Sequence, residues 1–162
     1  MQARPAGPED AAAIARIYND GIEERVATFE TRARTAGEIR SWFGGRHPVV
    51  VVEEGGDVVA FAATSEYRPR ECYAGVAEFS VYAESAARGR GAGRVAMEAL
   101  IRAAERAGFW KLVSRVFVEN GPSRSLLRSV GFREVGVYER HARLDGAWRD
   151  VVIVERLIPS NL

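Results

Sequence analysis

Apolar and polar residues along the chain follow two periods, and the changes between them predict a series of strands and helices. The first helix is expected after Pro8-Glu9-Asp10, because proline suits the first helical turn and the helix dipole favours acidic residues there. A short strand over Gln2–Ala6 is expected before it. Apolar residues then recur at helical spacing, at Ile14, Ile17, Tyr18 and Ile22.

A second helix and a hairpin are expected next. Thr35 is suited to cap a helix that ends at Gly44-Gly45. The segment Pro48–Glu54 contains four consecutive valines, which is typical of a strand buried on both faces. Gly55-Gly56-Asp57 then predicts a turn into a second strand, Val58–Tyr67.

The remaining elements complete an alternation of helices and strands. They are a strand over Ala74–Ala83, a helix over Val95–Ala107 ended by Gly108, a strand over Lys111–Val118, a short helix from Asn120 to Gly131, and strands over Phe132–Tyr138 and Val151–Ile158 on either side of an Asp145-Gly146 turn. The predicted order is β-α-α-β-β-β-α-β-α-β-β. We therefore expect an α/β fold with a central mixed, mostly antiparallel sheet flanked by helices.

Composition narrows the function classes. The 162 residues are expected to form one domain over residues 1–162, large enough to bury a core without metals or disulfides. Lysine and arginine number 23 and aspartate and glutamate 22, so the net charge indicates neither nucleic acid nor a membrane surface as partner. The single cysteine, Cys72, excludes an internal disulfide and a cysteine-based metal cluster, and we expect no metal. No apolar stretch approaches ~18 residues and no leader pattern is visible, so we expect a cytoplasmic protein.

One turn carries a concentration of glycine and arginine, Arg88-Gly89-Arg90-Gly91-Ala92-Gly93, between a predicted strand and a predicted helix. The first amides of a helix lack intrahelical partners and carry partial positive charge, which favours a phosphate. No Lys-Ser or Lys-Thr follows, which excludes a P-loop, and the glycine spacing is too short for a dinucleotide fingerprint. By itself the hexapeptide fits a flexible turn with solvated arginines equally well.

Two motifs resemble the GNAT acetyltransferases. The first is Arg88-x-x-Gly91-x-Gly93, and the second is Asn120-x-x-Ser123-x-x-Leu126-Leu127-x-x-x-Gly131-Phe132. The resemblance implies a GNAT fold and acetyl-CoA as co-substrate, with the pyrophosphate on the turn and the pantetheine along the preceding strand. The cofactor residues that it implies are Val81, Tyr82, Ala83, Arg88, Gly89, Arg90, Gly91, Ala92, Gly93, Arg94 and Asn120.

Further segments resemble one group within that family. Glu78-Phe79-Ser80-Val81-Tyr82, the loop Tyr67–Tyr73, Asp145–Val151, and Ile22-Glu23 followed by Thr28-Phe29 are similar to acetyltransferases that act on phosphinothricin, arsinothricin or methionine sulfoximine. The resemblance implies acetyl transfer to the α-amine of a small glutamate-like amino acid, a role in antibiotic resistance, and a homodimer.

Glu78 is the candidate general base. Strand alternation places it on one face with Ser80 and Tyr82, and a mid-strand carboxylate must face water, a partner or a cleft. Direct transfer requires a base because the amine arrives mostly protonated, and such a base contributes ~10²–10⁴-fold. The alternative role is an ion pair with an arginine of a neighbouring strand; the resemblance favours the base.

The resemblance also implies a substrate pocket, which we assign to Phe29, Arg68, Arg70, Tyr73 and Ser80. Arg70 could hold a carboxylate with its planar fork, whereas in isolation it would be a solvated loop residue. Many relatives carry tyrosine or histidine as a general acid where this chain has Leu127. Tyr82 or water then remains as the acid, or the thiolate leaves unprotonated. We assign no catalytic role to Cys72, His47 or His141, although His141, among several arginines, could line the rim of the active site or be solvated.

Two other functions are compatible with parts of the sequence. The same fold could acetylate a protein N-terminus, a lysine, an aminoglycoside or a polyamine, although arginines in the expected substrate loops would repel cations. The third hypothesis is a non-catalytic acyl-CoA-binding module. It is the least favoured, because such a module would lack the base and Glu78 is present.

Overall fold

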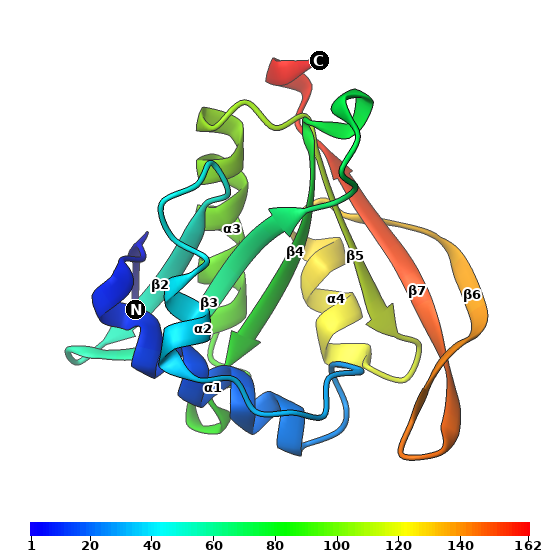
Figure 1. The fold of residues 1–162 in the computed structure, drawn as a ribbon, viewed down its shortest axis with the longest axis horizontal. Helices are drawn as coiled ribbons and strands as arrows, with labels where there is room; N and C mark the ends of the chain where they lie inside the picture. The colour runs from blue at the N-terminus through cyan, green and yellow to red at the C-terminus, as the bar shows by residue number, and fades with distance from the viewer.

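The computed structural model describes residues 1–162 and is built around one seven-stranded sheet with strand order β1-β2-β3-β4-β5-β7-β6 (Figure 1). Neighbouring strands run antiparallel except β4 and β5, which are parallel. The strands are β1 (Gln2–Pro5), β2 (Val49–Glu54), β3 (Asp57–Glu66), β4 (Val76–Ala83), β5 (Lys111–Phe117), β6 (Arg133–Leu144) and β7 (Ala147–Leu157). The mixed, mostly antiparallel sheet and the order of elements are confirmed.

Helices cover both faces of the sheet (Figure 1). The helices are α1 (Ala11–Glu23), α2 (Ala36–Arg40), α3 (Ala92–Arg106) and α4 (Gly121–Ser129), with 3-10 turns at Pro8–Asp10, Glu71–Tyr73, Ser85–Ala87 and Pro159–Asn161. The core on the α3 and α4 side takes Val50 and Val52 of β2, while the core on the α1 and α2 side takes Val49 and Val51. The valine run is therefore buried on both faces, as its sequence predicts. None of the helices combines the length and apolar character that crossing a bilayer requires.

Element boundaries differ from the predicted ones where tertiary packing decides them. The Thr35 side chain does cap α2, accepting a bond from the Glu38 amide at 3.1 Å, but the helix ends at Arg40 rather than at the glycine pair. Trp42 and Phe43 instead pack on the core from the following turn. The last two strands are longer than predicted, because a two-residue turn with positive φ joins them directly.

Strands β4 and β5 diverge along their length and leave room for a site between them. The two strands pair only from Val76 to Glu78 and from Lys111 to Val113, and they separate beyond those residues (Figure 1). At the point of separation the Ser114 hydroxyl donates to the Phe79 carbonyl at 2.9 Å and takes the place of a ladder bond. The carboxyl half of β4 therefore has no strand neighbour on this side.

Candidate functional site

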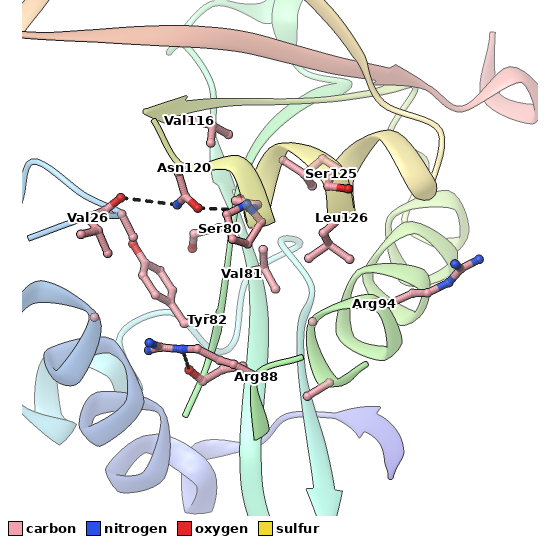
Figure 2. A pocket seen from close by; sticks show the side chains of 18 of the residues that line it. Val26, Ser80, Val81, Tyr82, Arg88, Arg94, Val116, Asn120, Ser125 and Leu126 are labelled. Carbon is pink, nitrogen blue, oxygen red and sulfur yellow. Dashed lines mark hydrogen bonds between the residues drawn. The ribbon is translucent and has the colours of Figure 1, made fainter. Parts of the chain in front are cut away.

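A cavity of about 700 Å³ lies where β4 and β5 separate. It is lined by the carboxyl half of β4, the glycine-rich turn, the start of α3 and one side of α4. Figure 2 shows Ser80, Val81 and Tyr82 along β4, between Asn120 and Arg88. The predicted cofactor residues that line this cavity are Val81, Tyr82, Ala83, Arg88, Gly89, Gly91, Ala92, Gly93, Arg94 and Asn120.

The turn before α3 is shaped for close approach to its backbone. Gly91 is the N-cap of α3 with φ 93°, and Gly89 has φ 71°, both in the left-handed region that favours glycine. No atom lies within 4 Å of where a Cβ would stand on either residue, so both face open space. At Gly93 a Cβ would come within 2.9 Å of Leu126, so this glycine permits contact between α3 and α4. The first residues of α3 line the cavity, and a helix N-terminus, where amides lack intrahelical partners, fits a pyrophosphate there.

The arginines of the turn differ in position. Arg88 donates to the Ala83 carbonyl at 3.0 Å and to Glu24 at 2.7 Å, and because all three residues line the cavity, these bonds hold the guanidinium at its wall. Arg94 lines the cavity and pairs with Glu98 in the next turn of α3. The predicted cofactor residue Arg90 does not line the cavity, because its guanidinium pairs with Glu54 at 2.7 Å.

The start of α4 forms the opposite wall. Asn120 caps the helix by accepting a bond from the Ser123 amide at 3.3 Å, and its amide group donates to the Val26 carbonyl at 3.4 Å (Figure 2). Leu127 is buried in the core at 1% exposure and carries no ionisable group. The position where many relatives carry an acid is therefore apolar here.

Tyr82 is a poor substitute for that acid. Its ring stacks with Phe61 at 5.5 Å and meets Tyr18 edge-on at 5.1 Å. Burial raises the pKa of Tyr82 well above its ordinary value. A thiol has an ordinary pKa of about 8.5, so a proton would move uphill from Tyr82 to a leaving thiolate. Departure of the thiolate without a proton from a side chain fits the structure better.

A second cavity of about 720 Å³ adjoins the first. Glu78 lies in its wall beside Ser65, its neighbour across the β3–β4 pairing. The residues that line both cavities are Ala27, Ser80, Tyr82, Ser114 and Arg115. An acyl group carried in the first cavity can therefore meet an amine held in the second at this junction.

Glu78 is half-accessible, with 29% of its side chain exposed. Its carboxylate accepts a single contact, from the Arg115 guanidinium at 3.3 Å. The alternative foreseen for a mid-strand carboxylate, an arginine from a neighbouring strand, is therefore present together with the placement that a base requires. One long contact leaves carboxylate lone pairs free to accept a proton from a substrate.

The predicted substrate residues separate into two groups. Phe29 and Ser80 line the second cavity, and Phe29 packs edge-on against Phe117 with ring centroids 4.9 Å apart. Arg68, Arg70 and Tyr73 do not line it. Their loop forms its own exposed cluster, in which Arg68 lies over Tyr67 and Arg70 over Tyr73. The structure thus does not bring Arg70 to Glu78.

Arg115, in the second cavity, was missed by the sequence analysis, whereas His141, for which a place at the rim of the site or in solvent was left open, lines the cavity. Arg115 contacts Glu78 with one nitrogen, and its other terminal nitrogen lies 3.4 Å from Nε2 of His141. Alternation along β5 places Arg115 on the face of Val113, but only the register, which pairs Val113 with Glu78, shows that this is also the face of Glu78. His141 depends on an irregularity in β6 that carries no sequence signal.

The matching family model is described as the Acetyltransferase (GNAT) family, and it covers residues 14–132. The chain is 30% identical over 164 residues to the phosphinothricin N-acetyltransferase of Streptomyces coelicolor, covering 96% of this chain and 95% of that protein. It is also 30% identical over 159 residues to the L-methionine sulfoximine/L-methionine sulfone acetyltransferase of Salmonella typhimurium, covering 96% and 93%.

Solved structures of acetyltransferases are similar to this chain over nearly its full length. The ribosomal-protein-alanine N-acetyltransferase from Brucella melitensis has a TM-score of 0.92 at 31% identity, covering 98% of this chain and all of that one. The phosphinothricin acetyltransferase from Sinorhizobium meliloti, in complex with acetyl-CoA, has a TM-score of 0.89 at 28% identity, covering 97% and 88%. With the glycine turn, the divergent strands and the matching family model, the chain belongs to the GNAT family and is an acetyl-CoA-dependent N-acetyltransferase.

Proposed function

We propose that the enzyme acetylates the α-amine of a small glutamate-like amino acid of the phosphinothricin, arsinothricin or methionine sulfoximine type. The observation that carries this is the position of Glu78, in a cavity that meets the cofactor cavity at shared residues. The names of the relatives support the substrate class. The second cavity, walled by Phe29 and Phe117, has the volume to enclose a small amino acid.

The transfer is direct. Acetyl-CoA supplies a thioester carbonyl carbon, and only a neutral amine attacks it. Glu78 accepts the proton that the ammonium group loses, the nitrogen–carbon bond forms, and the carbon–sulfur bond breaks. The nitrogen loses its second proton as it becomes an amide, and this proton passes through solvent to the departing thiolate; Leu127 has no proton to give, and burial raises the pKa of Tyr82.

A thiol-release assay tests the substrate class. Purified enzyme and acetyl-CoA are supplied with phosphinothricin, methionine sulfoximine, glutamate, spermidine or a short peptide. We expect turnover of the first two well above that of spermidine and peptide. Turnover confined to spermidine or peptide would refute the amino-acid substrate and leave the acetyltransferase assignment intact.

A protein N-terminus is the second candidate substrate. The Brucella melitensis structure, whose name assigns it to ribosomal-protein alanine, is 31% identical to this chain, and the Streptomyces coelicolor phosphinothricin enzyme is 30% identical. A peptide beginning with alanine therefore belongs in the same panel. Its turnover at a higher kcat/KM than that of every amino acid would favour this candidate.

We also propose that the enzyme is a homodimer. Val137 and Trp148, on β6 and β7, are each 52% exposed and lie on the same face of that hairpin. Exposed apolar residues grouped in this way are typical of a protein interface. Light scattering after gel filtration should give twice the chain mass, and Val137→Glu with Trp148→Glu should give the chain mass. A monomeric wild type at tens of micromolar would contradict the proposal.

The cytoplasmic location stays a prediction of the sequence.

A further inference from the structure

The substrate cavity holds a guanidinium that neither GNAT motif explains. Arg115 projects from β5 on the same face as Glu78, and it lines both cavities. Its side chain is 45% exposed, so the guanidinium is open to the cavity contents. Its contacts with Glu78 and His141 are long, at 3.3 and 3.4 Å. Most of its five N–H donors therefore stay available to a ligand.

A bulge in β6 brings His141 to this guanidinium. The pairing of β6 with β7 shifts register between Tyr138 and Ala142. Arg140, inside the bulge, has φ 48°, and its amide donates to the Asp150 carboxylate at 2.7 Å. Bulges of this kind redirect side chains next to active sites. His141 consequently lies over the cavity, where an unprotonated Nε2 can accept a bond from Arg115 and hold it in place.

The charges along the cavity wall make Arg115 the available cation. The lining includes three carboxylates, Glu30, Glu66 and Glu78, but a single arginine. Glu30 is already paired with Arg34 at 2.7 Å. A second guanidinium, that of Arg149, stands over the ring of the lining residue Phe117 at 5.5 Å, and its Nε is buried without a hydrogen-bond partner. Arg115 is therefore the arginine of the lining that contacts Glu78, while Glu66 is a further exposed carboxylate and Arg149 is not among the lining residues.

That combination matches the head of an α-amino acid. The ammonium and carboxylate groups of such a molecule are bonded to one carbon, so they need a carboxylate and a cation side by side. Glu78 and Arg115 stand 3.3 Å apart and supply both. With the amine at Glu78 and the carboxylate at Arg115, the substrate side chain is left to extend past Phe29. Arg115 also lines the cofactor cavity, so the amine held beside it is close to the junction.

We propose that Arg115 binds the α-carboxylate of the substrate and that His141 is its positioning residue. The inference rests on the proposed amino-acid acetyltransferase function. It assigns the binding of the substrate carboxylate to an arginine on β5 instead of one in the Arg68–Tyr73 loop. Planar paired contacts from a guanidinium suit a carboxylate better than an ammonium does. A structural Glu78–Arg115 pair without substrate contact is the competing explanation.

The test compares each amino acid with its own carboxamide. Steady-state kinetics are measured for methionine sulfoximine and its amide with wild type, Arg115→Gln, Arg115→Lys and Arg115→Ala. Loss of a charge-assisted contact lowers kcat/KM for the acid by about 10- to 100-fold relative to the amide, mostly through KM. Arg115→Lys recovers part of this ratio. Thermal melting checks that each variant is folded. If Arg115→Ala does not fold, the comparison is made with Arg115→Gln.

Two arginine controls complete the design. Arg102→Ala removes an exposed charge on α3 that lines neither cavity, so it should leave the acid-to-amide ratio unchanged. Arg70→Ala tests the rival loop arginine, and we expect it to lower the ratio less than Arg115→Ala does. His141→Phe should lower the ratio only a few-fold, because it removes the support and keeps the guanidinium.

The outcomes separate the two proposals. If wild type acetylates the amino acid and Arg115→Ala loses activity equally on acid and amide, Arg115 serves Glu78 alone and the inference is overturned while the proposed function stands. A larger loss of ratio in Arg70→Ala than in Arg115→Ala overturns it too. If wild type turns over peptides or spermidine but no amino acid, the proposed function fails and takes the inference with it.

Discussion

Replacing Gly91 by valine tests the phosphate-binding role of the turn. Gly91 has φ 93°, so any side chain there costs about 1–2 kcal/mol in conformational strain, and a β-branched one more. Its Cβ would stand in open space on the cavity side, where the amides of α3 begin. The loss of charge-assisted contacts from backbone amides to a phosphate is worth about 1.5–3 kcal/mol. We therefore expect acetyl-CoA to bind at least about tenfold more weakly.

Gly108 provides a matched control at the other end of the same helix. It has φ 87° and open space at its Cβ, so Gly108→Val carries a similar strain, but it does not line the cofactor cavity. Both variants should lower the melting temperature by a few degrees, at about 2–4 °C per kcal/mol. Calorimetric titration with acetyl-CoA should show weaker binding only in Gly91→Val. Wild-type affinity in Gly91→Val, or equal losses in both variants, would refute the phosphate role of this turn.

Three further predictions concern the base, the acid and the stability of the fold. Glu78→Gln should lower kcat by about 10²-fold or more with little change in acetyl-CoA affinity, and the loss should shrink at high pH where the amine is already neutral; near-normal turnover at neutral pH would contradict the base. Tyr82→Phe should change kcat by no more than about threefold, because burial raises the pKa of Tyr82 and makes it a poor acid; a hundredfold loss would restore it as the acid. The Arg4 hydrogen bonds hold the pKa of Asp10 below its ordinary value, so this pair stabilises the fold above about pH 4 and the effect is lost as pH falls through the depressed folded pKa. Asp10→Asn should therefore cost about 1–2 kcal/mol in urea unfolding at pH 6 and progressively less as pH falls through the depressed folded pKa; a cost independent of pH would contradict the linkage.

The sequence by itself determined those features that depend on neighbours along the chain. Periodicity and turn chemistry predicted the order of strands and helices, and the structure confirms that order. Thr35 and Asn120 act as N-caps, because a cap is decided by a side chain and amides three residues away. The positive φ of Gly91 follows from the same local chemistry. The resemblance to the family, and with it the co-substrate, rested on motifs of this kind, whose residues lie close together in the sequence.

Tertiary structure alone decided which side chains meet. The parallel pairing of β4 with β5 lasts three residues, and this short register sets Arg115 beside Glu78. His141 reaches them through a bulge stabilised by Asp150, on a different strand. The loop carrying Arg70, which its motif assigned to the substrate, instead packs on its own aromatic residues. Strand register and loop placement depend on contacts between residues far apart in the chain, and local propensity and periodicity contain no information about them.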